Sequence, residues 1–153
     1  MTTKSKHAVL FGGSFNPPHI GHRAIVKRLA ARKRVDEVWV IPVYQHRFRK
    51  HLPPFAKRMR LCKSFFVPLS PKVKVQDFEK RVRAGGRTLD LLLFLEKKFP
   101  DYRFSLAMGQ DAYRQRHAWY RFAEIKKRVT VIVFPRGPHS YIPNVASRDI
   151  RKA

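Results

Sequence analysis

Two histidines three residues apart are the side chains of this sequence that most suggest chemistry. His19 and His22 follow the stretch GGSFNPP (12–18), which comes directly after an apolar run, and they precede a segment with helical spacing. Residues three apart on a helix share one face, and a helix N-terminus attracts anions through its unpaired N–H groups. Two imidazoles at such a position would add directed donors to phosphate oxygens. We therefore expect a phosphate-binding site here rather than a turn with two surface histidines.

The glycines and prolines around these histidines fit the same interpretation. Gly12 and Gly13 are expected to let the chain turn sharply and to bring backbone N–H groups near a ligand. Pro17 and Pro18 are expected to stiffen the approach to the helix. A metal held by the two histidines would lack a nearby carboxylate or cysteine, so we expect no protein-held metal ion.

Short apolar segments alternate with helical segments along the chain. The predicted strands are 7–13, 36–42, 72–78, 102–109 and 129–135, and the predicted helices are 20–34, 55–66 and 87–99, with a broken helix over 111–128. The first helix is expected to bury Ile20, Ala24, Val26 and Leu29, and the segments 44–54 and 81–86 are expected to be loops. Short strands that are apolar on both faces indicate a parallel sheet covered by helices. The sequence thus predicts a single α/β domain with a doubly wound, Rossmann-like sheet of about five strands, whose ligand site lies beyond the carboxyl ends of the strands.

The composition restricts the class of protein and its partners. The chain has 153 residues, 44% of them hydrophobic, which suits one domain with a sizeable core. The single cysteine, Cys62, excludes an intramolecular disulfide and a Cys-rich zinc site. The sequence shows neither a signal-peptide pattern nor an apolar run of the roughly 20 residues that span a bilayer, so a cytoplasmic protein is expected. Lys and Arg total 34 against 10 acids, a net charge of +24, which would attract nucleotides, nucleic acid or anionic lipid without indicating which.

Three blocks of the chain resemble one enzyme family. GGSFNPPHIGH (12–22) resembles the signature of the nucleotidylyl transferases that share an HxGH motif, with Asn16 where many relatives have Asp. LAMGQDAYRQRHAWYRF (106–122) resembles the bacterial nicotinate mononucleotide adenylyltransferases, and EKRVRAGGRTLDLLLFL (79–95) resembles their preceding helix, with Gly86-Arg87-Thr88 in place of Ser-Tyr-Thr. The resemblance implies adenylyl transfer from ATP to nicotinate mononucleotide, which yields the dinucleotide and pyrophosphate. Such a reaction depends on in-line positioning and charge stabilisation rather than on a general base.

The resemblance also implies roles for individual residues. His19 and His22 would be the catalytic pair, with His22 nearest the α-phosphate, and Mg²⁺ would accompany the triphosphate. Trp119 would stack on the pyridine ring, Asp111 would accept ribose hydroxyls, and Arg87 would pair with the nicotinate carboxylate. The implied ATP-binding residues are Gly12, Gly13, Ser14, Phe15, Asn16, His19, Gly21, His22, Arg136, Ser147, Arg148 and Arg151. The implied acceptor-binding residues are His46, Arg58, Arg87, Thr88, Gly109, Asp111, Trp119 and Tyr120. Without the resemblance, Trp119 would be read as a core residue, Asp111 as a helix cap and Arg87 as a solvated side chain.

The end of the sequence departs from the family pattern. The family's late motif resembles Ile-Ser-Ser-Thr-x-x-Arg, which here reads VASRDIR (145–151), so that Ser147 and Arg151 match and Arg148 replaces a hydroxyl by charge. We expect a shortened C-terminus with an apolar flank that a second subunit would cover. One alternative is therefore a catalytically weakened nucleotide- or nucleic-acid-binding protein, whose affinity would fall steeply with salt. Another is a sister transferase that uses nicotinamide mononucleotide, phosphopantetheine or flavin mononucleotide as the acceptor.

Overall fold

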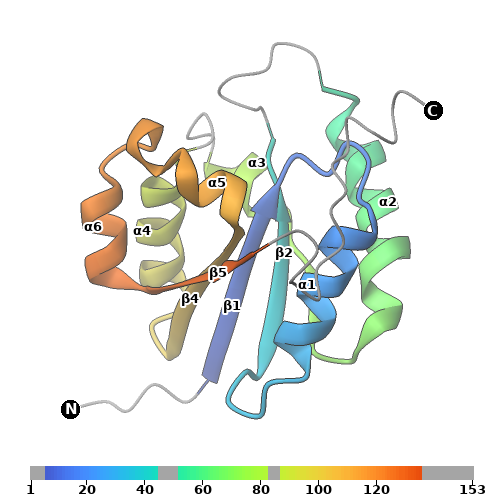
Figure 1. The fold of residues 1–153 in the computed structure, drawn as a ribbon, viewed down its shortest axis with the longest axis horizontal. Helices are drawn as coiled ribbons and strands as arrows, with labels where there is room; N and C mark the ends of the chain where they lie inside the picture. Colours follow the sequence, from blue (N-terminus) through green and yellow to red (C-terminus); the bar gives the residue numbers. More distant parts are fainter. Residues whose placement is uncertain (1–5, 45–51, 83–86, 136–153) are drawn as a thin grey trace.

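Five parallel strands form a single sheet in the computed structural model, which describes residues 6–44, 52–82 and 87–135 (Figure 1). The strand order is β3-β2-β1-β4-β5. The strands are β1 (Lys6–Gly13), β2 (Glu37–Pro42), β3 (Val73–Val75), β4 (Tyr102–Gly109) and β5 (Thr130–Phe134). The helices are α1 (Ile20–Ala30), α2 (Phe55–Phe66), η1 (Val67–Leu69), α3 (Phe78–Val82), α4 (Thr88–Lys98), α5 (Gln110–Arg114), η2 (Arg116–Ala118) and α6 (Phe122–Arg128). This confirms the predicted doubly wound α/β fold, and none of the described helices has the length and apolarity needed to cross a membrane.

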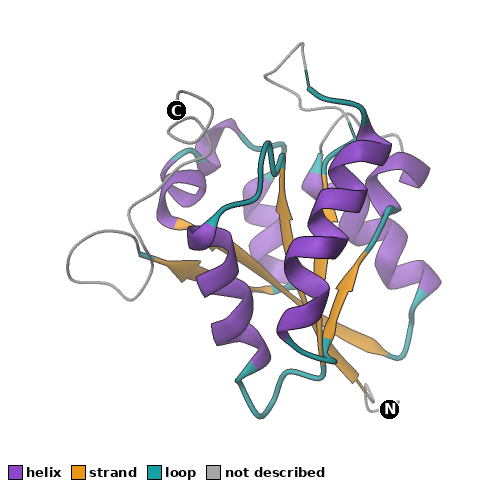
Figure 2. Ribbon diagram, turned by 90° about the vertical axis from the view of Figure 1, so that its right-hand side faces the viewer, coloured by secondary structure: helices purple, strands orange, loops and turns teal. Residues whose placement is uncertain are grey.

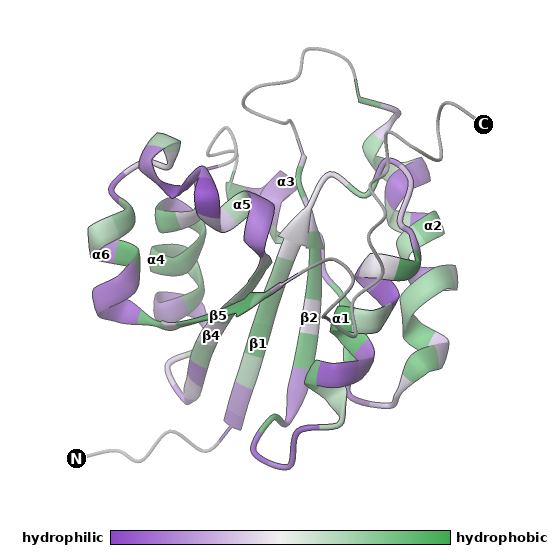
Figure 3. Cartoon of the chain, in the orientation of Figure 1, coloured by the Kyte–Doolittle hydropathy of each residue, from purple (hydrophilic) through white to green (hydrophobic). Residues whose placement is uncertain are grey.

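Alternate residues of each central strand pack against different helical layers. In β1, Val9 and Phe11 contact the core beneath α1 and α2, whereas Ala8 and Leu10 contact the core beneath α4 and α6. Figure 2 shows helices in front of and behind the sheet, and Figure 3 shows that the strands between them are largely apolar. Because both faces of the strands are covered, the apolar runs in the sequence are continuous rather than alternating with polar residues.

Helix α1 is shorter than predicted and buries a slightly different face. The helix ends at Ala30, and successive turns over the next residues bring Val35 into the core. Ile20 is 53% exposed, whereas Ile25 is 5% exposed and packs against the sheet. The prediction of Ile20 as a core residue was wrong, because the helix turns Gly21 and Ile25, one turn apart, to its inner face and leaves Ile20, its first residue, outside.

The segment between β3 and α4 also differs from the prediction. The predicted strand 72–78 pairs with β2 over Val73–Val75 alone. The next element is the short helix α3, which the sequence did not predict and which occupies part of an expected loop. Phe78 and Glu79 at its start are both buried, so α3 is held by burial against the core rather than by helix propensity. This helix brings a carboxyl group into the interior of the domain.

A buried carboxylate joins four strands at the opposite end of the sheet from the site described below. Glu37 in β2 accepts hydrogen bonds from Trp39 Nε1 at 2.9 Å and from Tyr102 Oη of β4 at 2.6 Å. It also pairs with Lys74 Nζ of β3 at 2.8 Å and Lys6 Nζ of β1 at 3.5 Å. Burial raises the pKa of Glu37, but the hydrogen bonds from Lys74, Tyr102 and Trp39 outweigh it and bring the pKa to about 2. The amino ends of the strands are therefore held in register, which fixes the carboxyl ends where ligands bind.

Candidate functional site

A pocket opens where the strand order of the sheet reverses. Strand β1 pairs with β2 on one side and with β4 on the other, so the chain leaves β1 in one direction and later crosses to the other. Such a switch point leaves a crevice beyond the carboxyl ends of the two strands. A pocket of about 260 Å³ lies there, lined by Leu10, Phe11, Gly12, Gly13, Ser14, Ile41, Val43, Glu79, Arg87, Thr88, Leu91, Leu106, Ala107, Met108, Gly109, Ala112, Gln115, Ala118, Trp119 and Tyr120. It includes eight of the residues that the sequence assigned to ligands: Gly12, Gly13, Ser14, Arg87, Thr88, Gly109, Trp119 and Tyr120.

The chain turns after β1 at a phenylalanine rather than at the glycines. Gly12 and Gly13 are extended and pair with Ile41 and Pro42 of β2, so the expected sharp turn at the glycines was wrong. The left-handed residue is Phe15, with φ of 46°, and it is 2% exposed. A Cβ at Gly13 would lie 3.2 Å from the Phe15 ring, so that glycine makes room for the turn. The missing side chain at Gly12 leaves the pocket open to the strand backbone.

The two histidines form the start of α1. His19 is the N-cap residue, and its Nδ1 accepts the backbone N–H of Gly21 at 3.1 Å. His22 Nδ1 accepts the backbone N–H of His19 at 3.0 Å, which completes a capping box. Since each Nδ1 is an acceptor, the ring proton of each neutral imidazole lies on Nε2. The rings are stacked, with centroids 3.6 Å apart, so the two Nε2 donors come from one side-chain stack at a helix N-terminus.

Arg58 binds the backbone of the surrounding loops rather than a ligand. It is 1% exposed, and its guanidinium donates to four carbonyl oxygens: Pro53 at 3.1 Å, Ser14 at 3.3 Å, Val43 at 2.6 Å and Tyr44 at 3.1 Å. The expectation that Arg58 contacts a phosphate is corrected, because four of its five N–H donors bind backbone carbonyls and the side chain is buried within the protein. Its role is to hold Ser14 and Val43, two residues of the pocket wall, in place.

The wall of the pocket formed by α4 and the segment after η2 carries aromatic and cationic groups. Arg87, the N-cap residue of α4, places its guanidinium 4.3 Å from the centroid of the Tyr120 ring. Trp119 is partly buried, contacts Phe122 edge-on at 5.8 Å, and also lines the pocket. The tryptophan therefore belongs both to the core and to the pocket.

The GQD segment begins at the floor of this pocket. Gly109 ends β4 and is the N-cap residue of α5, and a Cβ there would meet no atom within 4 Å. The backbone at Gly109 therefore faces open space that a ligand can occupy. Asp111 is exposed in the first turn of α5 and is not among the residues that line the pocket. It is not the helix cap considered above, and its contact with ribose hydroxyls stays a prediction.

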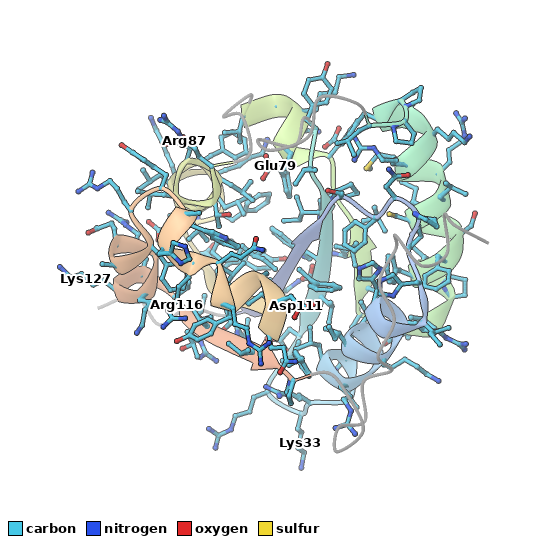
Figure 4. All side chains as sticks on the ribbon, turned by 45° about the horizontal axis from the view of Figure 1, so that its top comes forward. Lys33, Glu79, Arg87, Asp111, Arg116 and Lys127 are labelled. Atoms are coloured by element: carbon cyan, nitrogen blue, oxygen red, sulfur yellow. The ribbon has the colours of Figure 1, made fainter. Side chains whose placement is uncertain are left out.

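Glu79 is a pocket residue that the sequence did not single out. It lies on α3, is 5% exposed, and lines the pocket beside Arg87 and Thr88. Figure 4 shows Glu79 toward the interior, whereas Lys33 and Lys127 extend outward. Burial, with a smaller effect of the Asp90 charge, raises the pKa of Glu79 to about 7. The signal in the sequence was weak: an acid two residues after Asp77 and directly before the basic run KRVR (80–83).

Several expected ligand residues lie outside the described part of the chain. These are His46, Arg136, Ser147, Arg148 and Arg151. Phe15 and Asn16 belong to the segment between β1 and α1, and Gly21 lies in the first turn of α1; none of the three lines the pocket itself. Within residues 6–44, 52–82 and 87–135, no three His, Cys, Asp or Glu side chains are grouped to hold a metal ion.

Comparison with known proteins identifies the family. Residues 10–153 match the model of the cytidylyltransferase-like family. A relative from Myxococcus xanthus (strain DK1622), described as "Probable nicotinate-nucleotide adenylyltransferase", is 38% identical over 83% of this chain and 67% of its own length. A relative of the same description from Anaeromyxobacter sp. (strain K) is 34% identical over 95% of this chain and 82% of its own length.

The fold is shared with a solved structure. The nicotinic acid mononucleotide adenylyltransferase of Plasmodium falciparum, solved in complex with NaAD, superposes with a TM-score of 0.75 at 20% identity, covering 96% of this chain and 83% of its own. At this identity the likeness concerns the fold alone. From the family match, the sequence relatives and the shared fold, the chain belongs to the cytidylyltransferase-like family, among the nicotinate-nucleotide adenylyltransferases.

Proposed function

We propose that this protein transfers the adenylyl group of ATP to nicotinate mononucleotide, giving nicotinate adenine dinucleotide and pyrophosphate, as a step of NAD biosynthesis. The observation that carries the proposal is the arrangement at the switch point. One wall of the pocket includes Gly12, Gly13 and Ser14, and the stacked histidine pair at the start of α1 comes shortly after these residues in the chain. The other wall carries Arg87, Thr88 and Trp119. Anionic groups suit the first region, and a flat ring with a carboxylate suits the second.

The described residues can position the reactants without acting as a base. The attacking group is a phosphate that is already ionised, so the barrier depends on alignment and on stabilising the charge that develops as pyrophosphate leaves. The Nε2–H groups of His19 and His22, with the N-terminus of α1, are proposed to bind phosphate oxygens of ATP. Mg²⁺ bound to the triphosphate would neutralise further charge on those oxygens.

The acceptor is proposed to lie against the opposite wall. The pyridine ring stacks on Trp119, and its carboxylate reaches Arg87 and the first N–H groups of α4, where Arg87 forms no side-chain cap. The open space at Gly109 admits the ribose. Ribose hydroxyl contacts of Asp111 and phosphate contacts of Ser147, Arg148 and Arg151 remain part of the proposal.

The direct test is an assay with ATP, Mg²⁺ and either nicotinate mononucleotide or its amide. Dinucleotide is measured by mass together with released pyrophosphate. Product from the acid form is expected. If folded protein binds ATP but forms no product with either acceptor, then a different acceptor or a binding role is indicated.

Trp119→Ala is expected to raise the KM for the acceptor. Stacking of a flat ring on an aromatic side chain is worth about 1–3 kcal/mol, which corresponds to roughly a 5- to 150-fold change in affinity. The KM for ATP is expected to stay near the wild-type value. The matched control is Trp119→Phe, which keeps an aromatic face and the contact with Phe122. Equal effects of both variants on both substrates would indicate a structural role alone.

A second candidate property is binding to polyanions, because one face of the domain carries no acidic residues in its helices. Helices α1 and α2 contain Lys and Arg but no Asp or Glu, and the sequence has no acid from residue 38 to 76. Catalysis on one nucleotide pair does not account for a net charge of +24. Affinity for nucleic acid is expected to fall steeply with salt in a titration. A salt-independent affinity, or none at low salt, would contradict this candidate.

A further inference from the structure

Glu79 is a buried acid in the pocket that adenylyl transfer does not require. Glu79 is 5% exposed, and it lines the pocket together with Arg87 and Thr88. In the part of the chain that the structure describes, no hydrogen bond or ion pair to Glu79 is formed. Nevertheless, no side-chain oxygen of residues 6–44, 52–82 and 87–135 is fully buried without a hydrogen-bond partner. The carboxyl oxygens of Glu79 are therefore open to the pocket, and a ligand there would be their partner.

Glu79 lies near the place proposed for the carboxylate or carboxamide group of the pyridine ring. Helix α3 packs against α4, and Glu79 is near enough to Asp90, in the first turn of α4, for that charge to affect its pKa. Arg87 begins the same turn. The carboxyl thus lies beside the helix start at which the nicotinate carboxylate is expected. The nicotinate carboxylate, when bound there, would therefore lie next to the Glu79 carboxyl.

Among the residues that the structure describes, the other charged groups near Glu79 do not neutralise it. On α3 itself, Lys80 and Arg81 are exposed, and Arg81 pairs with Asp77 at 3.3 Å. On α4, Asp90 adds negative charge, and Arg87 lies over the Tyr120 ring instead of pairing with Glu79. Strand β2, which also packs against α3, has no titratable side chain after Glu37, at the far end of the strand. Tyr120 is the remaining titratable side chain of the pocket lining.

We propose that Glu79 distinguishes the acid form of the acceptor from the amide form. This inference rests on the proposed function, because it assumes that the pyridine ring binds between Trp119 and the start of α4. When protonated, the Glu79 carboxyl donates a hydrogen bond to the nicotinate carboxylate, and the two groups share one proton as close carboxyl pairs do. When ionised, the Glu79 carboxylate repels the acid and accepts a hydrogen bond from the carboxamide N–H of the amide.

The sign of the pH effect follows from this arrangement. Protonated Glu79 binds the acid, so affinity for the acid is full at low pH and is lost as the pH rises through the pKa of Glu79. The pKa of about 7 places this loss within the working range of a biosynthetic enzyme. Above it, the KM for nicotinate mononucleotide is expected to rise by up to about tenfold per pH unit. Binding of the amide is expected to strengthen or stay level over the same range.

The test compares wild type with Glu79→Gln between pH 6 and 9. The measurements are the KM for nicotinate mononucleotide and the inhibition constant of nicotinamide mononucleotide. Their ratio cancels the titration of the nucleotide phosphate, which both share. In wild type the ratio is expected to rise with pH, and in Glu79→Gln it is expected to be flat, since glutamine does not titrate. Asp90→Asn should shift the midpoint down by removing the neighbouring charge, whereas the matched control Glu124→Gln, on α6, should leave the profile unchanged.

A calorimetric readout separates this role from a structural one. Near pH 7.5, wild type should take up a proton from the buffer when it binds nicotinate mononucleotide. The measured binding enthalpy should therefore differ between buffers of different ionisation enthalpy. Binding to Glu79→Gln should show no such uptake. If wild type turns over the acid with a pH-independent ratio, or if Glu79→Gln weakens acid and amide equally at every pH, the role of Glu79 is overturned while the function stands. Absence of dinucleotide from wild type at every pH would instead contradict the proposed function.

Discussion

Replacing His22 with alanine is expected to lower kcat by about 100- to 1,000-fold, the usual effect of removing one donor from a charge-stabilising site. His22 Nε2 is proposed to meet the phosphate at which adenylyl transfer occurs, whereas its Nδ1 accepts the backbone N–H of His19 at 3.0 Å. The alanine variant loses both functions of the ring. The N-cap interaction is worth about 1 kcal/mol, so the variant should remain folded.

Two further substitutions separate the catalytic donor from the helix cap. In His22→Asn the amide oxygen takes the place of Nδ1, so the hydrogen bond from His19 is kept while the outer donor is removed. In His22→Gln the amide nitrogen reaches the position of Nε2. Steady-state kinetics should therefore show His22→Asn to be as inactive as the alanine variant and His22→Gln to be partly active. In urea unfolding, His22→Asn should be as stable as wild type. Near-wild-type turnover in His22→Asn would rule out the proposed phosphate contact.

Arg58→Met is expected to lower the free energy of unfolding by roughly 3 kcal/mol or more, because it leaves four partly buried hydrogen bonds unmade at about 1–3 kcal/mol each. Methionine has a similar length, so little of the effect would come from a cavity. The carbonyls of Ser14, Val43, Tyr44 and Pro53 would all lose a partner. The measurement is urea unfolding followed by circular dichroism, with the m-value checked for unchanged two-state behaviour.

The matched control for this prediction is Arg60→Met on the same helix. Arg60 is exposed, and a surface substitution of this kind changes stability by about 0.5 kcal/mol or less. The two variants remove the same charge from the chain, so general electrostatics cannot explain a difference between them. If Arg58→Met were as stable as Arg60→Met and instead raised the KM for nicotinate mononucleotide, then Arg58 would contact substrate after all.

Hydrophobic pattern and motif spacing predicted the sheet and the location of the site. Each central strand is covered on both faces, so its apolar run is visible without tertiary information, and the histidine motif follows the first of these strands. Arg58 and Arg60 look alike in the sequence, because what separates them is which side of α2 faces the loops after β1 and β2. Helix α3 was missed for a related reason: it is too short to show a period, and burial rather than propensity holds it. The turn at Phe15 was assigned to the glycines because a left-handed phenylalanine is unusual and depends on core packing.

The left-handed turn at Phe15 has a consequence for motion. Its ring packs edge-on against Phe11 at 5.7 Å and Phe66 at 5.5 Å, and against the His22 ring at 4.9 Å. The segment that carries the histidines is therefore fastened to the same buried layer as β1 and α2. The amide hydrogens of His19 and Gly21, which are bonded to the two imidazoles, should exchange with solvent only when that whole layer opens, unlike those of a loop that frays on its own. Substrates thus meet a phosphate-binding segment whose shape is already set, and the ordering of that segment is part of folding rather than of binding.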